Sequence, residues 1–166
     1  AMFKPIDELE IGGNYSYIDA HYKSFKYKSA TPVWDCNSTA ANGYLMTRTP
    51  DLKCIPLQYL SPNIFSVYGR ITVPTPDNVG TVSLFLSYAW TDSRHQSGPA
   101  LEKFVDGSRT WEPGSDLAAY GLLSASLDWK NALGSGLDAS LFGTNLLDKD
   151  YKLSNSGVYN AIGNQA

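Results

Sequence analysis

Charged residues are scarce in this sequence of 166 residues: Asp, Glu, Lys and Arg make up 17% of it, against about 25% in an average soluble domain. The formal net charge is −3, so the chain lacks the basic stripe that nucleic-acid binding needs. No run of about 18 apolar residues occurs, which excludes a transmembrane helix. The first residues also lack the apolar core of a signal peptide.

Residues that carry enzyme chemistry are few as well. There are two histidines and two cysteines, and no spacing among them matches a zinc site. The cluster of Asp92, Arg94 and His95 is interpreted as a solvated loop cluster, since no ligand spacing supports a haem or a metal there. We therefore expect no enzyme, no bound metal and no cofactor.

The two cysteines, Cys36 and Cys54, lie in a segment rich in Thr, Asn, Pro and Ser that is typical of a long surface loop. A disulfide between them would close a loop of roughly 19 residues, worth about 3 kcal/mol in the chain-entropy model. Such a bond implies an oxidising compartment. The disulfide is the favoured interpretation, and two free thiols are the alternative.

Helical periodicity is nearly absent, and only the start of the chain and the stretch 100–105 are candidates for short helices. Strict alternation of apolar and polar residues, which predicts β-strands with two different faces, occurs instead in five runs. These runs are residues 9–17, 64–73, 81–90, 122–130 and 137–145.

The connections between the runs alternate between long and short. The two short links, 74–80 and 131–136, contain Gly with Asn, Asp, Pro or Ser, which favours hairpin turns. The other connections, and the residues after the last run, are long. If neighbouring strands are antiparallel, all short turns lie at one end of the sheet and all long loops at the other.

The alternation alone is compatible with a soluble antiparallel sheet that has one face on a core. Three features favour an outer-membrane β-barrel instead: small uncharged residues on the polar faces, segregated loop lengths and aromatic residues near strand ends. The aromatic residues concerned are Tyr15, Tyr17, Tyr88, Trp90 and Trp129. We thus expect an all-β fold, an antiparallel up-and-down meander of about five strands. It would form part of a transmembrane β-barrel, because five strands cannot close one.

The residues from Tyr120 onward resemble the carboxy-terminal strands of TonB-dependent outer-membrane receptors. The most specific part is Asn145-Leu-Leu-Asp148-Lys-Asp-Tyr151, which is similar to a family segment that leads from the next-to-last strand into the last extracellular loop. Residue chemistry explains the motif: Asn145 and Asp148 can bond local backbone where the strand ends, and Tyr151 suits an interface or loop packing. An ordinary strand exit in any β protein is the alternative.

This resemblance implies that residues 1–166 are a partial barrel segment of a receptor in the outer membrane of a Gram-negative bacterium. The family's plug domain, TonB-binding motif and final strand are not in the sequence. The implied partners are the rest of the barrel and plug, TonB through the absent amino-terminal part, outer-membrane lipid and a small-molecule ligand. The parent would take up a scarce nutrient, such as an iron chelate (siderophore uptake) or another large organic molecule.

In such a receptor, loops and lumen-facing side chains bind the ligand. Aromatic and Arg side chains in loops are plausible anchors, although packing between loops is the alternative for each one. The loop candidates are Trp34, Tyr44, Arg48, His95, Arg109 and Trp111. The candidates for polar residues facing the lumen are Glu10, Arg70, Asp128 and Lys130.

A second hypothesis assigns a different function to the same strands. A soluble all-β module, similar to a carbohydrate-binding domain, would use aromatic loops to bind its ligand. Membrane dependence distinguishes the two, since a receptor segment exposes apolar strand faces to lipid.

Overall fold

The computed structural model describes residues 1–37, 46–96, 102–105, 108–111 and 116–154. The chain divides into two compact units, which we call the sheet unit and the loop unit. The sheet unit comprises Ala1–Tyr17, Asn63–Asp92 and Ala119–Tyr151. The loop unit comprises Ile18–Pro62, Ser93–Ala118 and Lys152–Ala166.

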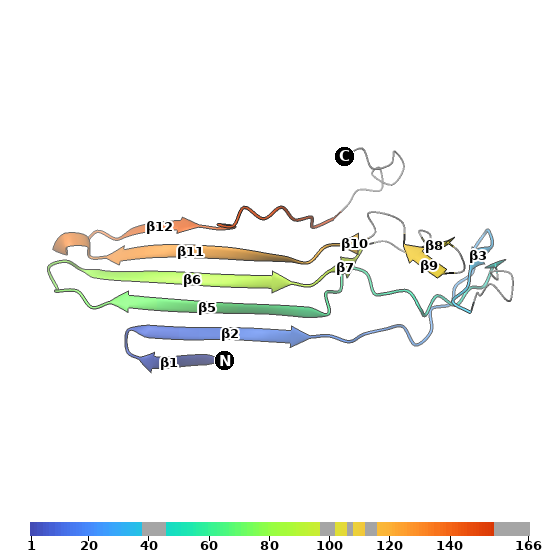
Figure 1. Cartoon of the computed structure of the whole chain (residues 1–166), viewed down its shortest axis with the longest axis horizontal. Coiled ribbons are helices and arrows are strands. Elements are labelled where there is room, and N and C mark those ends of the chain that lie inside the picture. The colour runs from blue at the N-terminus through green and yellow to red at the C-terminus, as the bar shows by residue number, and fades with distance from the viewer. Residues whose placement is uncertain (38–45, 97–101, 106–107, 112–115, 155–166) are drawn as a thin grey trace. The chain divides into compact units, whose positions relative to one another are not determined.

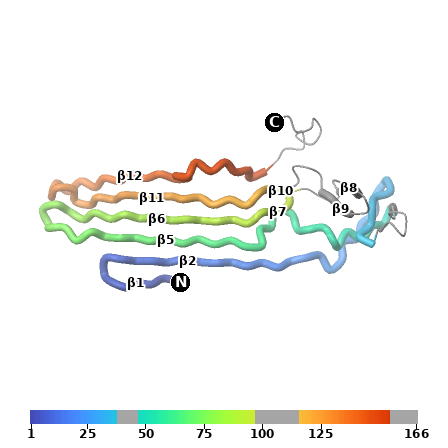
Figure 2. The backbone as a smooth tube through the Cα atoms, in the orientation of Figure 1, coloured from blue at the N-terminus to red at the C-terminus, as the bar shows by residue number. Residues whose placement is uncertain are grey.

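The sheet unit is one antiparallel sheet of six strands in chain order, β1-β2-β5-β6-β11-β12 (Figure 1). The backbone trace shows these strands lying side by side as an up-and-down meander (Figure 2). Their bounds are Met2–Ile6 for β1, Leu9–Tyr17 for β2, Asn63–Val73 for β5, Thr81–Thr91 for β6, Tyr120–Lys130 for β11 and Ala139–Gly143 for β12.

The all-β antiparallel prediction is confirmed, and the expected number of strands is corrected from five to six. The extra strand is β1, whose residues Met2 and Phe3 break the alternation and whose Pro5 lowers strand propensity. Proline is tolerated there because β1 is an edge strand, with an unpaired side. The helical candidates were wrong: the chain starts with a strand, and Glu102–Val105 is strand β8.

The loop lengths are segregated as predicted. The strand ends at Tyr17, Asn63, Thr91 and Tyr120 lie next to one another in the register, and every long connection starts or ends there. The hairpin loops after β1, β5 and β11 lie at the opposite end. The last of these contains the short 3₁₀ helix η3 at Ala132–Gly134.

Short strands in the loop unit form three two-stranded pairs: β3 (Val33–Trp34) with β4 (Met46–Thr47), β7 (Arg94–His95) with β10 (Asp116–Leu117), and β8 with β9 (Ser108–Trp111). Among the described residues, no helix is long and apolar enough to cross a membrane.

Candidate functional site

The register of the sheet gathers the apolar residues of all its long strands on one face, which we call the apolar face. Phe65 lies between Tyr15 and Trp90, and Leu84 lies between Ile71 and Leu127. Because side chains alternate along a strand, the intervening small and polar residues share the other face, which we call the polar face. The predicted alternation therefore holds along most of β2, β5, β6 and β11, whereas Tyr68, Phe85 and Leu122 are large residues on the polar face.

The apolar face is exposed in the part of the chain that the structure describes. Val67, Leu86 and Leu141 retain 49%, 44% and 72% of their accessible surface, although they lie within paired strands. A soluble sheet covers such a face with a second layer of structure. Contiguous exposed apolar patches of this kind mark a surface that meets lipid or another protein.

Aromatic rings border the apolar face at the end from which the long connections start. Phe65 and Trp90 stack with their ring centroids 5.5 Å apart, and Tyr15 is the cross-strand partner of Phe65 on its other side. The Tyr15 hydroxyl donates to Asn63 Oδ1 at 2.7 Å, and Asn63 Nδ2 donates to Asp92 at 2.8 Å. At this border, the apolar rings are thus followed by a network of hydrogen-bonded polar side chains.

Trp129 marks the other border, beside the hairpin loops. Its indole N–H donates to the Val79 carbonyl at 2.8 Å. Eight residues separate Phe65 from Val73, which lies in the last row before the hairpin loops. At about 3.3 Å per residue, the face is roughly 26 Å long, or about 20 Å high at a barrel strand tilt of about 40°. The apolar band of outer-membrane barrels is about 25 Å tall.

The polar face carries the four residues that the sequence predicts to face a lumen. Glu10 and Arg70 are direct cross-strand partners, and Glu10 forms an ion pair with Lys4 at 3.6 Å. The Arg70 guanidinium lies over the ring of Phe85, 5.1 Å from its centroid, in a cation–π arrangement. Lys4, Glu10 and Arg70 thus lie next to one another across β1, β2 and β5, with the Phe85 ring of β6 beside Arg70.

Hydroxyl groups extend this polar network toward β12. Asp128 accepts hydrogen bonds from Ser140 at 2.7 Å and from Ser126 at 3.4 Å. Thr72 and Ser83 are bonded to each other at 3.2 Å. Lys130 is exposed at the end of β11. Small hydroxyl side chains on this face are therefore hydrogen-bonded to one another and to Asp128.

The loop segment Ile18–Pro62 has a small core of its own, which the sequence analysis did not foresee. Trp34 is 5% exposed and packs with Leu52 and Ile55, with Tyr22 and Phe25 against them. Trp34 is one of the predicted loop candidates for ligand binding, and its side chain is buried in this core, which is the arrangement that the loop-packing alternative expects.

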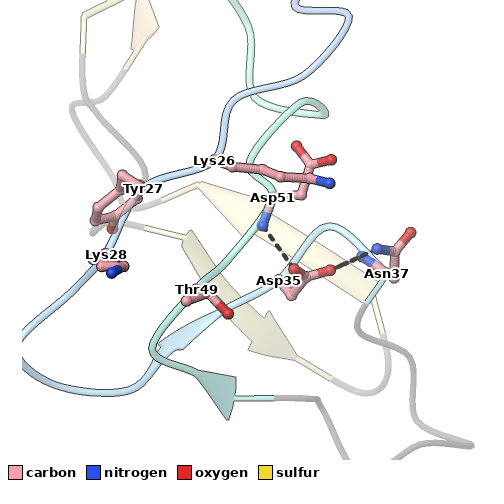
Figure 3. Close-up of a pocket in the computed structure, with 7 residues that line it drawn as sticks. All are labelled: Lys26, Tyr27, Lys28, Asp35, Asn37, Thr49 and Asp51. Carbon is pink, nitrogen blue, oxygen red and sulfur yellow. Dashed lines mark hydrogen bonds between the residues drawn. The ribbon is translucent and has the colours of Figure 1, made fainter.

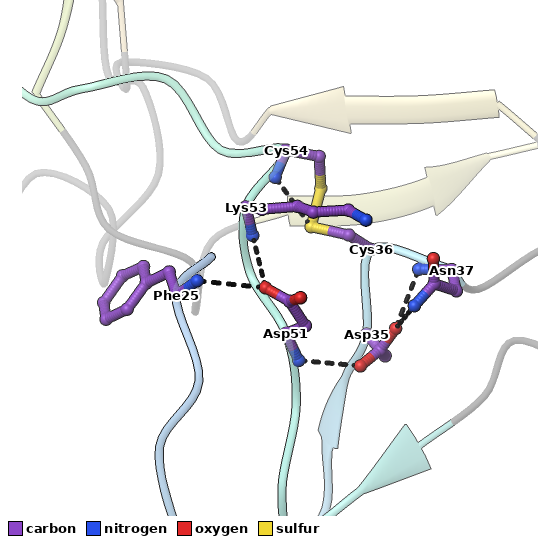
Figure 4. Close-up of a disulfide and its surroundings, with 7 residues drawn as sticks. All are labelled: Phe25, Asp35, Cys36, Asn37, Asp51, Lys53 and Cys54. Carbon is purple, nitrogen blue, oxygen red and sulfur yellow. Dashed lines mark hydrogen bonds between the residues drawn. A yellow bond between two sulfur atoms is a disulfide. The ribbon is translucent and has the colours of Figure 1, made fainter. Parts of the chain in front are cut away.

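A disulfide and two aspartates hold this core together (Figure 4). Cys36 and Cys54 are bonded, with an S–S distance of 2.04 Å. The Asp35 carboxylate accepts from the Asp51 backbone N–H at 2.7 Å, and from the backbone and side-chain nitrogens of Asn37, each at 2.8 Å. We call this arrangement of Asp35 and Asp51 the aspartate clasp.

The environment of Asp35 favours its ionised form. Burial acts to raise the pKa of its carboxyl group, but hydrogen bonds from Asp51 and Asn37, together with the positive charge of Lys53, outweigh it. The pKa of Asp35 is therefore held below its usual value. The Asp51 Oδ1 atom accepts hydrogen bonds from the backbone N–H groups of Phe25 and Lys53 at 3.0 and 3.2 Å.

Of the remaining loop candidates, the structure describes the side chains of Arg48 and His95. Arg48 is exposed, and His95 forms an ion pair with Asp116 through Nδ1 while its carbonyl accepts from the Tyr59 N–H at 2.7 Å. Tyr44 lies outside the described residues. The backbone of Arg109 and Trp111 lies in β9, and their side chains lie outside the description.

The Asn145–Tyr151 motif forms a compact exit from the sheet. The Asn145 side chain accepts from the Lys149 N–H at 3.0 Å and donates to the Lys149 carbonyl at 3.2 Å, which is the predicted bonding to local backbone. Asp148 contributes through its backbone N–H, which donates to the Asn145 carbonyl at 2.9 Å. Tyr151 stacks on Tyr120.

Sequence reasoning missed one further group, an open pocket beside the aspartate clasp. It is lined by Lys26, Tyr27, Lys28, Asp35, Asn37, Thr49 and Asp51 (Figure 3). The only sequence signal is that Asp35 and Asp51 lie close to the two cysteines. Among the described residues no group of three or more His, Cys, Asp or Glu could hold a metal ion.

Comparison of the chain with family models, with curated proteins and with solved structures gives no match.

Proposed function

We propose that this chain is a segment of a transmembrane β-barrel, and that the barrel belongs to an outer-membrane receptor of the TonB-dependent kind. The observation that carries the proposal is the separation of the sheet into an exposed apolar face and a hydrogen-bonded polar face. Lipid would contact the apolar face, and the polar face would line the lumen. The aromatic borders and the segregated loops support the same orientation.

If the sheet is part of a barrel, further strands must pair with both of its edges. Six strands are fewer than the eight of the smallest single-chain bacterial barrels, and an unpaired edge in lipid costs several kcal/mol for each unsatisfied backbone group. Among the described residues, no strand pairs with the outer edge of β1 or of β12. The rest of the receptor barrel would supply those partners, and its plug would meet the polar face.

The proposed activity is active uptake of a scarce nutrient, an iron chelate or another large organic ligand, with energy delivered through TonB. This part rests on the likeness of the Asn145–Tyr151 segment to the receptor family. The loop unit would lie outside the cell, where a disulfide can form. The alternative, a soluble ligand-binding module, requires a second layer over Val67, Leu86 and their neighbours.

Fractionation of the source cells tests the proposal, with an antibody raised against this segment. We expect a band well above the 18.2 kDa of this chain in the outer-membrane fraction, released only by detergent. A band near 18.2 kDa in the soluble fraction would overturn the receptor assignment and favour the soluble module. If the band lies in the outer-membrane fraction, deletion of the parent gene should abolish TonB-dependent growth on one scarce nutrient.

A further inference from the structure

A short two-stranded ribbon in the loop unit presents two lysines on one face. Lys26 pairs with Asp51 in an antiparallel bridge, and the Ser29 N–H donates to the Arg48 carbonyl at 2.9 Å, in the same register. Because side chains alternate along an extended segment, Lys26 and Lys28 project from one side. Both line the open pocket in Figure 3.

The same register places a hydroxyl group opposite one lysine and a carboxylate opposite the other. Lys28 faces Thr49, and Lys26 faces Asp51. Thr49 also lines the pocket, and its hydroxyl lies 3.4 Å from the Thr47 hydroxyl. The pocket therefore offers two ammonium groups and one hydroxyl as donors.

The two carboxylates of the pocket already accept hydrogen bonds from the protein itself. Asp35 accepts three N–H groups, and Asp51 accepts two backbone N–H groups on Oδ1. By contrast, neither Lys26 nor Lys28 lies within 4.0 Å of a carboxylate among the described residues. Both lysines are exposed. The two ammonium groups are thus donors without a carboxylate partner, although Asp35 and Asp51 balance their formal charge.

We propose that this pocket binds an oxyanion, a phosphate or carboxylate group, through Lys26, Lys28 and the Thr49 hydroxyl. Ammonium groups bind such anions as point charges, and charge-assisted hydrogen bonds are the strong ones. The aspartate clasp and the disulfide fix the ribbon, so the donors are positioned before the ligand arrives. The proposal concerns the loop unit alone and is independent of whether the sheet lies in a membrane.

Calorimetric titration of the full chain in a neutral detergent tests the site, with inorganic phosphate as the probe and chloride holding the ionic strength constant. We expect saturable binding that weakens about a hundredfold in the double variant Lys26→Gln/Lys28→Gln, the loss of two charge-assisted hydrogen bonds at about tenfold each. Lys23→Gln is the matched control, because Lys23 is exposed on the same segment outside the pocket. This control should bind like the original chain.

Two further measurements test whether each variant is folded and which kind of anion occupies the site. Protection of the Leu52 amide, which donates to the Phe25 carbonyl, reports whether each variant retains the folded loop unit. Doping the micelles with phosphatidylglycerol distinguishes sources: competition with phosphate assigns the site to a lipid headgroup, and no competition assigns it to a soluble oxyanion. The absence of saturable phosphate binding, or equal binding by the folded double variant, would overturn the proposal.

Discussion

The ring of Tyr151 stacks on the ring of Tyr120, with centroids 4.5 Å apart and planes inclined by 20°. Tyr120 begins β11, and Tyr151 ends the motif that follows β12, so the contact closes this segment onto the start of the neighbouring long strand. The Leu146 N–H supports the closure by donating to the Leu123 carbonyl at 2.9 Å.

Removing this stack should destabilise the exit from the sheet. We expect Tyr151→Ala to lower the free energy of unfolding by about 1 kcal/mol from the ring pair itself, with a further loss from apolar burial. Tyr151→Phe keeps the stack and should retain nearly all of the stability. Urea unfolding of the chain in detergent measures both, and equal stability of the two variants would show that the stack contributes nothing.

A glycine under an aromatic ring gives the second prediction. A Cβ at Gly12 would overlap the ring of its cross-strand partner Tyr68, whereas one at Gly69 would meet nothing closer than 4.0 Å. Gly12→Ala should therefore cost about 1–3 kcal/mol, the usual range for overpacking, and Gly69→Ala should be tolerated.

A second substitution makes the cause of that loss testable. Adding Tyr68→Ser to Gly12→Ala removes the ring that the new methyl group meets, so the additional cost of the Ala should disappear in a double-mutant cycle. If Gly12→Ala is equally harmful with and without the Tyr68 ring, steric overlap is not the reason.

Sequence patterns located most of the sheet because alternation is a direct consequence of one face being apolar. The predicted run 9–17 coincides with β2, and the runs near β5, β6 and β11 differ by one or two residues. The predicted run 137–145 is longer than the observed strand β12. The chain is still turning at Gly136, whose φ is +76°, and the Asp138 carboxylate accepts the Asn131 N–H, so the strand starts only at Ala139.

The loop unit was beyond the reach of periodicity, since its core assembles from residues far apart in the chain. Trp34 and Leu52 occur in separate irregular segments, and only the pair Cys36 and Cys54 hinted that these segments meet. The aspartate clasp depends mostly on backbone N–H groups, which every residue except proline carries. No residue pattern could reveal it.

Breaking the disulfide should affect the loop unit and spare the sheet. The replacement of both Cys36 and Cys54 by Ser should lower the local stability of the Ile18–Pro62 core by about 3 kcal/mol, because this core buries few side chains. Hydrogen exchange of the Leu52 amide should accelerate accordingly. The Ala125 amide in β11 should keep its exchange rate, and faster exchange at both positions would contradict separate stability.

Acid should loosen the aspartate clasp. The pKa of Asp35 is lower in the folded chain than its usual value, so its stabilising contribution is complete above the unfolded value of about 3.9. The contribution is lost as the pH falls through the lower folded value. Protection of the Asp51 amide, which donates to Asp35, should therefore fall below about pH 4 when the exchange rate is compared with the intrinsic rate at the same pH.

The variant Asp35→Asn is the control for this titration. It removes the charged acceptor of three hydrogen bonds and should destabilise the loop core at neutral pH by about 1.5–3 kcal/mol. Below pH 4, protection of the Asp51 amide should depend less on pH in this variant than in the original chain. An unchanged acid dependence in this variant would assign the effect to another carboxylate.

The central claim, that the apolar face meets lipid, is tested by spin labels placed along β6 of the chain reconstituted in lipid vesicles. Both native cysteines are paired, so single cysteines at Leu84, Leu86, Ser83 and Ser87 can be labelled selectively. We expect labels at 84 and 86 to collide preferentially with lipid-soluble oxygen, and labels at 83 and 87 to show no such preference. Equal oxygen accessibility at all four positions, or preferential collision of labels 84 and 86 with a water-soluble nickel chelate, would contradict the membrane account.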